Sequence, residues 1–293
     1  MRRRTAAALA AAILLLLSAC GEGPIPSEAP APSPTAAPEP TPDVTPEPLP
    51  EDMVPVEELI PGIYTDVRYA SADNFTGEAV YDSAEVYLRR GTAEKLAGVQ
   101  ARLEDEGLSL LIWDGWRPVA AQFALWRACP DPAYVSDPFG GVTNHCRGNT
   151  LDLTLVTLEG EPVEMPSGFD DFSALADRDY SDLGPAAAAN ARLLEAAMEA
   201  AGFSGYYYEW WHYTDCVDYP VCEALGEPEA VFADCVEFIS LRSAPDVSAP
   251  VLAEATRGAR LILLDELGDF SLVRCGEQYG YALSAYLSDK PIV

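Results

Sequence analysis

The chain contains only two histidines among 293 residues, and each lies in a short motif suited to holding a metal ion. His145 begins the sequence HCRGNTLD, which ends at Asp152, and His212 ends the sequence EWWH, which begins at Glu209. Two imidazoles and one carboxylate can bind Zn²⁺ tetrahedrally and leave the fourth position to water. Two buried, hydrogen-bonded histidines are the alternative, but histidines placed only for packing would not both be expected in such motifs. The sequence therefore predicts one zinc ion and a fold that joins the two motifs.

Asp152 is the carboxylate that the local pattern favours as a ligand. In the segment Leu151–Leu155 leucines alternate with polar residues, so in a strand Asp152 faces away from the leucines. Gly148 permits a turn after His145, which lets a loop histidine meet the strand carboxylate. A strand-face aspartate held by hydrogen bonds is one alternative, and a thiolate ligand from Cys146 is another.

Glu209 is predicted to be the catalytic base. It stands three residues before His212, and in a regular strand these two side chains face opposite sides. We therefore expect a bend or tight turn at Trp210-Trp211. Zinc lowers the pKa of its bound water to about 7. A carboxylate beside that water can accept the proton and pass it to a leaving amine.

Residues 1–19 are typical of a bacterial lipoprotein signal. Three arginines precede the apolar stretch Ala6–Leu17, whose 12 residues are too short to span a bilayer. The small residues before Cys20 favour cleavage there and acylation of its thiol; an ordinary secretory signal is the alternative. The sequence predicts an exported protein, anchored by lipid to the cell membrane and facing the outside or the periplasm.

Residues 20–52 are predicted to be the lipidated cysteine and a proline-rich tether. Eleven of the thirty residues from 21 to 50 are proline. Such a segment is extended by roughly 3 Å per residue and could reach a cell-wall layer up to roughly 90 Å away. The formal net charge of −29 repels nucleic acid, so we expect no nucleic-acid partner.

An even number of cysteines remains once Cys20 is assigned to the lipid, and in an exported chain this predicts disulfide bonds. The candidates are Cys129, Cys146, Cys216, Cys222, Cys235 and Cys275. Shared sequence features favour Cys129–Cys146, Cys216–Cys222 and Cys235–Cys275, although six cysteines leave the pairing open.

Residues 53–228 read as an α+β domain, because helical periods alternate with short strand patterns. The expected elements are a helix capped by Thr92 and ended by Gly107, a strand over 108–113, a helix begun by Pro118, a strand over 151–156, a helix from Pro185 to Gly202 and an aromatic strand over 206–213.

Residues 233–290 are predicted to form a small all-β barrel. Apolar runs at 260–264, 270–274 and 279–283 are separated by glycines. The phrases ISLRSAP at 239–245 and GYALSAYL at 280–287 resemble a bacterial SH3-like domain. Such domains bind cell-wall peptides or act as packing modules, and the sequence leaves both roles open.

The chain from about Val56 to Asp215 resembles the zinc D-alanyl-D-alanine peptidases, and in particular dipeptidases of the VanX type. The resemblance rests on VRYA at 67–70, DNFTG at 73–77, IWDGWRP at 112–118, HCRGNTLDLTL at 145–155, FD at 169–170 and EWWHY at 209–213. It implies the α+β zinc-peptidase fold shared with hedgehog signalling domains.

The resemblance also implies roles for individual residues. The implied zinc ligands are His145, Asp152 and His212, with Glu209 as the base and acid. Arg117, held between Trp116 and Pro118, is implied to stabilise the transition state, as its donors suit an oxyanion; from the sequence alone it would be read as a surface arginine.

Two further positions correspond to substrate contacts. Asp170 corresponds to the group that holds the free ammonium of the dipeptide. Thr143 stands where the family often has serine and keeps a hydroxyl. Cys146 also stands where the family often has serine.

These observations predict a zinc peptidase that hydrolyses D-Ala-D-Ala at the cell surface. The predicted export distinguishes this chain from the cytosolic members of the family, which destroy a wall precursor before it is used. A D,D- or L,D-carboxypeptidase or an endopeptidase acting on peptidoglycan stem peptides is therefore an alternative. A non-catalytic wall-binding lipoprotein is a further one, although Glu209 beside the histidines argues against it.

Overall fold

The computed structural model describes residue 49 and residues 51–292. The predicted signal, Cys20 and nearly all of the proline-rich tether lie outside these residues. None of the helices in the described part is long and apolar enough to cross a membrane.

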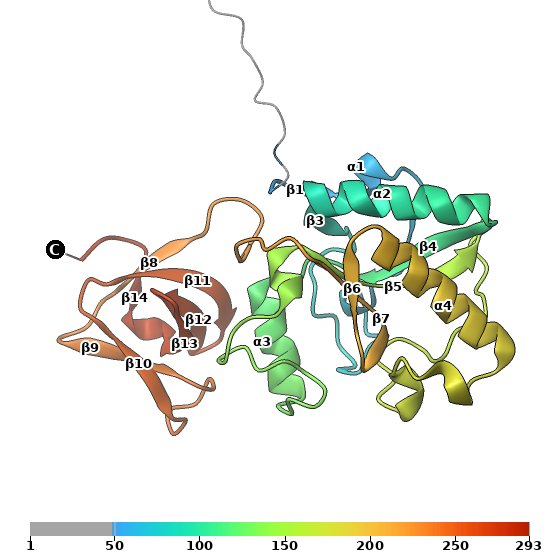
Figure 1. Cartoon of the computed structure of the whole chain (residues 1–293). Helices are drawn as coiled ribbons and strands as arrows, with labels where there is room; N and C mark the ends of the chain where they lie inside the picture. Colours follow the sequence, from blue (N-terminus) through green and yellow to red (C-terminus); the bar gives the residue numbers. More distant parts are fainter. Residues whose placement is uncertain (1–48, 50, 293) are drawn as a thin grey trace, which may run out of the picture. The chain divides into compact units, whose positions relative to one another are not determined.

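A five-stranded mixed sheet forms the centre of the first domain (Figure 1). Its strands, in the order β2-β4-β5-β7-β6, are β2 (Tyr64–Thr65), β4 (Leu108–Asp114), β5 (Thr150–Thr157), β7 (Glu209–Asp215) and β6 (Phe203–Tyr206). β2 pairs with β4 in parallel, and the other pairs are antiparallel. A separate two-stranded sheet joins β1 (Met53–Pro55) to β3 (Tyr87–Arg89).

Two long helices, α2 (Arg90–Asp105) and α4 (Pro185–Ala200), cover this sheet, and leucines of both enter one hydrophobic core with leucines of β5. The remaining helices are shorter: α1 (Val56–Leu59), α3 (Val119–Ala128) and the 3₁₀ helices η1 (Arg68–Ala70), η2 (Asn144–Arg147), η3 (Ala174–Ala176), η4 (Tyr180–Asp182) and η5 (Ser284–Tyr286). Helices segregated from a mainly antiparallel sheet confirm the predicted α+β class.

Two local expectations change in the structure. Thr92 lies inside α2 and does not cap it, because its hydroxyl donates to the buried carboxylate of Asp215 over 2.9 Å. The predicted aromatic strand is two strands, β6 and β7, joined by a turn at Tyr207 and Tyr208. The aromatic content suited a strand throughout and did not reveal the turn.

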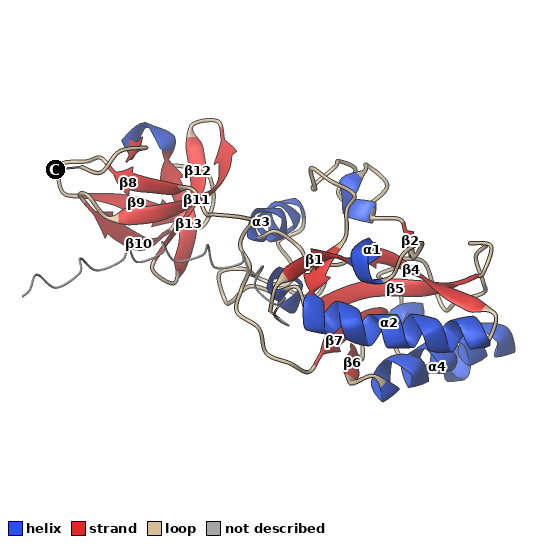
Figure 2. Ribbon diagram, turned by 90° about the horizontal axis from the view of Figure 1, so that it is seen from above, coloured by secondary structure: helices blue, strands red, loops and turns tan. Residues whose placement is uncertain are grey.

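The C-terminal part is an all-β unit, as predicted (Figure 2). Its seven strands, in the order β10-β9-β13-β12-β11-β8-β14, are β10 (Val251–Thr256), β9 (Phe238–Arg242), β13 (Gln278–Leu283), β12 (Phe270–Cys275), β11 (Arg260–Leu267), β8 (Ala230–Ala233) and β14 (Leu287–Ser288). The sheet starts with β8, slightly before the predicted boundary at residue 233, because Ala230 pairs with Ile262 of β11.

The expected disulfide bonds are not formed in the structure. The free cysteines are Cys129, Cys146, Cys216, Cys222, Cys235 and Cys275. Cys146 lies in η2 beside Cys222, whose backbone N–H donates to the Cys146 carbonyl over 2.8 Å. Cys129 follows α3 and packs in a different hydrophobic cluster from Cys146. The predicted partners Cys129 and Cys146 therefore lie in different clusters, whereas Cys235 and Cys275 both pack against the core of the C-terminal domain.

Candidate active site

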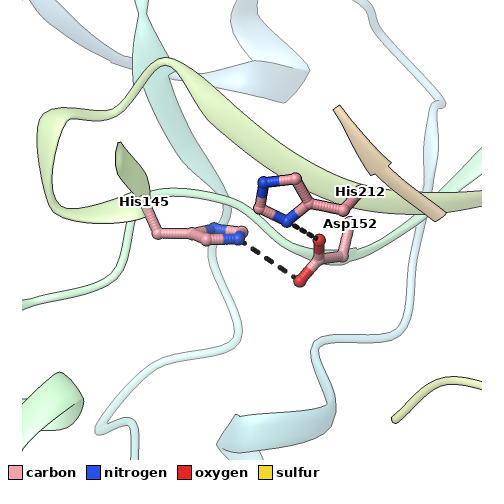
Figure 3. A group of neighbouring side chains, drawn as sticks. All are labelled: His145, Asp152 and His212. Carbon is pink, nitrogen blue, oxygen red and sulfur yellow. Dashed lines mark hydrogen bonds and ion pairs between the residues drawn. The ribbon is translucent and has the colours of Figure 1, made fainter. Parts of the chain in front are cut away.

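His145, Asp152 and His212 form a group that could hold a metal ion (Figure 3). One ligand atom from each lies within 4.8 Å of the others. Nε2 of His145 is 3.4 Å from Oδ2 of Asp152, and Nδ1 of His212 is 3.0 Å from Oδ1 of Asp152. Two ligands at about 2.1 Å from a tetrahedral zinc ion lie about 3.4 Å apart, so this donor set and its spacing fit such an ion.

Local backbone structure presents His145 to this group. η2 is capped by the Thr143 hydroxyl, which accepts from the His145 backbone N–H, and it ends at Gly148 with a left-handed φ of 76°. The imidazole Nδ1 donates to the Gly115 carbonyl over 2.8 Å. In the neutral imidazole, a proton on Nδ1 leaves the lone pair of Nε2 free to bind a metal.

Sheet pairing joins the other two ligands. Asp152 of β5 stands directly opposite His212 of β7 in the antiparallel register. Asp152 is 3% exposed. Burial opposes its ionisation, but the adjacent His145 and His212 lower its pKa below the usual range, so it is a carboxylate.

Glu209 reaches the same side of β7 as His212, with Oε2 3.5 Å from His212 Nδ1. This requires the expected irregularity. In the pairing of β6 with β7, Tyr206 is opposite Glu209 while the preceding Gly205 is opposite Tyr213. The intervening residues 210–212 form a bulge, and a bulge is the usual way in which a strand redirects its side chains.

The Glu209 carboxyl has a pKa raised to about 7. Burial is the main cause; His212 acts in the opposite direction, and the negative charge of Asp152 adds to the rise. A carboxyl with a pKa near neutrality can both accept and return a proton at physiological pH.

Arg117 is not the surface arginine that its turn alone suggests, because it is 8% exposed. Its Nε and Nη2 donate to one oxygen of buried Asp114 over 3.1 and 2.7 Å, and Nη1 donates to Gln122 over 2.7 Å. Burial opposes the charged form, but Asp114 raises the pKa of Arg117 above its usual value. These bonds use three of the five N–H donors of a guanidinium and leave donors for a ligand.

Asp170 lies in the same pocket and has unusual backbone geometry. Its φ of 51° is the single positive value among the described non-glycine residues. The Tyr69 hydroxyl donates to its Oδ2 over 2.8 Å. Burial raises the pKa of Asp170 to about 7, against the lowering effect of this hydrogen bond. A cation beside Asp170 would relieve the cost of burying its charge.

One pocket of about 780 Å³ contains all of the predicted metal-ligating, catalytic and substrate-binding residues. These are Arg117, Thr143, His145, Asp152, Asp170, Glu209 and His212. Its outer wall includes the exposed aromatic residues Tyr134, Phe172 and Tyr208. Perturbed carboxyl groups converging in one large concave pocket are typical of an active site.

Cys146 is not part of the metal group found among the described residues. Its side chain is fully buried in a hydrophobic cluster with Val119 and Phe123. Burial raises the pKa of its thiol to about 12, so it is neutral and a poor metal ligand.

Several supporting residues were missed from the sequence, and they act through long-range contacts. Asp114 orients Arg117 and also accepts from the Tyr81 hydroxyl over 2.7 Å. Tyr69 orients Asp170. The position of Asp114, a charged residue at the end of a buried strand pattern, was the available signal.

Two histidines, a carboxylate ligand and a nearby acid in one pocket define the site of a metal-dependent hydrolase. A family model described as D-Ala-D-Ala dipeptidase matches residues 50–223, and one described as bacterial SH3 domain matches residues 237–288. The chain belongs to this D-Ala-D-Ala dipeptidase family, the M15 peptidases, and its first domain is an enzyme domain of that family.

Curated relatives agree with this placement. The chain is 39% identical over 162 residues to the D-alanyl-D-alanine dipeptidase of Escherichia coli K12, a match that covers 55% of this chain and 83% of the relative. It is 37% identical to the Streptomyces coelicolor dipeptidase, covering 56% and 91%, and 34% identical to that of Enterococcus faecalis, covering 54% and 88%.

Proposed function

We propose that the chain is a zinc peptidase that hydrolyses D-Ala-D-Ala. The observation that carries this proposal is the joint position of Glu209 and the metal group, with the Glu209 carboxylate 3.5 Å from His212. Zinc, when held by His145, Asp152 and His212, supplies Lewis-acid chemistry: it polarises a peptide carbonyl and lowers the pKa of water.

Glu209 moves the proton. Its carboxylate accepts a proton from the attacking water, and the resulting acid delivers it to the nitrogen of the leaving alanine.

Arg117 and Asp170 orient and stabilise the substrate. Arg117 donates to the carbonyl oxygen as it gains negative charge, and Asp114 and Gln122 hold the guanidinium in place before substrate arrives. Asp170 accepts from the free ammonium of the dipeptide, and the Tyr69 hydroxyl fixes its carboxylate. Thr143 lines the same pocket.

A hydrolysis panel tests this proposal. Zinc-loaded protein is given D-Ala-D-Ala and L-Ala-D-Ala, and released alanine is measured. We expect D-Ala-D-Ala to be cleaved and Glu209→Gln to lower kcat by about 10²–10⁴-fold while zinc stays bound, because the amide cannot accept the proton. Intact D-Ala-D-Ala after incubation with zinc-loaded wild type would refute the proposal. An equally active Glu209→Gln variant would remove Glu209 from the mechanism.

Longer wall peptides are a second candidate substrate. The pocket volume of about 780 Å³ far exceeds what two alanines fill, and its wall carries the exposed Tyr134 and Phe172, whose ring centroids lie 4.6 Å apart. Mass spectrometry of a muropeptide stem ending in D-Ala-D-Ala, after incubation with the enzyme, distinguishes a dipeptidase from an enzyme that acts on longer peptides. Loss of one terminal alanine from the stem supports a carboxypeptidase, and cleavage of the free dipeptide alone excludes it.

A further inference from the structure

The bulge that brings Glu209 and His212 together leaves backbone groups without a strand partner. β6 pairs with β7 at Glu209 and again at Tyr213, so residues 210–212 have no partner in β6. Trp210 and Trp211 are also almost fully buried, at 0% and 2% exposed. Buried carbonyls need hydrogen-bond donors, and an unpaired one costs about 1–3 kcal/mol.

Arg178 supplies the missing donors. Its Nη2 donates to the carbonyls of Trp210 and His212 over 3.1 and 3.0 Å and lies 3.3 Å from that of Glu209. Its Nε donates to the Tyr206 carbonyl over 2.8 Å. One guanidinium therefore spans both strands of the hairpin across the bulge.

The Arg178 side chain is itself firmly held. It is 7% exposed, and Nη1 donates to Glu195 of α4 over 3.1 Å. Its guanidinium carbon lies 4.5 Å from the centre of the Tyr213 ring. Its backbone N–H donates to the Tyr207 carbonyl over 2.9 Å. Gly205 makes room for the Arg178 guanidinium, because a Cβ at position 205 would overlap it.

We propose that Arg178 is a positioning residue for the active site, which maintains the β7 bulge and thereby turns Glu209 and His212 to the same side. Without the bulge, two residues three apart in a strand face opposite ways. The inference rests on the proposed function for the roles of these two residues, and it concerns how they are oriented. Arginine suits the task because its planar fork donates to several carbonyls at once, whereas lysine is a point charge.

The first test compares Arg178→Lys with wild type by zinc affinity, the visible spectrum of the Co²⁺-substituted protein, and kcat and KM. We expect zinc affinity and kcat to fall by about 10–100-fold, as for other residues that orient metal ligands. The Co²⁺ spectrum should change because His212 shifts, and KM should stay close to wild type because Asp170 and Tyr69 are not contacted by Arg178.

Arg192→Lys is the matched control. Arg192 also stacks on a tyrosine, at 5.5 Å from the Tyr180 ring, but it donates to the Ala188 carbonyl within its own helix α4. The Arg192→Lys variant should therefore keep the zinc affinity, the Co²⁺ spectrum and the kcat of the wild type. Wild-type values of all three in a folded Arg178→Lys variant would overturn the proposal.

Gly205→Ala provides a second route that keeps the arginine. The added Cβ displaces the guanidinium, so we expect the same loss of zinc affinity and spectral change. In an Arg178→Ala background the same substitution should have no further effect, since nothing remains to displace. Equal effects in both backgrounds, or wild-type zinc binding in Gly205→Ala, would contradict the proposal. Zinc affinity and the spectrum need no substrate, so these results stand apart from the identity of the substrate.

Discussion

At the scale of single residues, the site is built from groups whose ordinary ionisation is shifted by burial. Glu209 and Asp170 are both raised to a pKa of about 7, whereas Asp152, between two imidazoles, stays charged. The pKa of each of the three carboxyl groups is therefore set by its neighbours. These differences distinguish a metal ligand, which stays charged, from a group that carries a proton.

Asp170→Asn should stabilise the zinc-free protein at neutral and alkaline pH. The folded-state pKa of Asp170 is about 7, above the ordinary value of about 3.9, so its charge opposes folding as the pH rises through this window. The variant should match wild type below about pH 4 and exceed it by on the order of 2–4 kcal/mol above about pH 7. Urea unfolding at several pH values measures this.

The same variant should weaken substrate binding, because a neutral amide holds an ammonium poorly. KM for the dipeptide is expected to rise. Asp171→Asn is the control, since Asp171 accepts from the Ser173 backbone N–H and an asparagine can do the same. A pH-independent stability difference for Asp170→Asn would contradict the assignment.

At the scale of elements, short irregular segments place the ligands that regular strands cannot. η2 turns His145 toward β5, and Gly148 ends it with a φ of 76°. A Cβ at Gly148 would lie 2.8 Å from the Met53 sulfur, so this turn also packs tightly against β1. The β7 bulge likewise turns Glu209 and His212 toward the metal site.

Gly148→Ala should destabilise the fold and weaken zinc binding. The left-handed backbone costs a non-glycine residue about 1–2 kcal/mol, and the added Cβ requires a shift of η2 or of the Met53 side chain. Gly107→Ala is the matched control, because Gly107 has a φ of 80° but nothing within 4 Å of its Cβ position. Thermal unfolding and zinc affinity should show that both variants lose stability and only Gly148→Ala loses zinc. Equal zinc affinity in the two would contradict this.

At the scale of the whole molecule, a family enzyme domain is followed by a bacterial SH3 domain, and the sequence predicts an N-terminal signal and a proline-rich tether before them. We propose that this order holds the enzyme at the cell surface, with the C-terminal domain available for cell-wall peptides. An external location favours substrates released from or attached to the wall.

Cys20→Ala should release the protein from the membrane. The substitution removes the thiol that we propose carries the lipid. Fractionation of cells and labelling with a fatty-acid analogue measure the change. Cys216→Ala, at an exposed cysteine, should stay lipidated and membrane-bound. Unchanged fractionation of Cys20→Ala would contradict lipid anchoring.

Much of this protein follows from local sequence. The long helices, β4, β5 and the three C-terminal strands β11, β12 and β13 were predicted because their hydrophobic patterns are regular. The metal group was predicted because its ligand types are rare and lie in compact motifs. The bend near Trp210 was predicted because Glu209 and His212 could serve one site only if the strand were irregular there.

Tertiary structure alone decided how that site is held. Asp114 behind Arg117, Tyr69 behind Asp170, and Arg178 across the bulge are joined to their partners by contacts between separate elements. The cysteine neighbours were likewise set by the fold. Spacing along the chain carries information about one helix or strand at a time, whereas these contacts depend on how elements pack against one another.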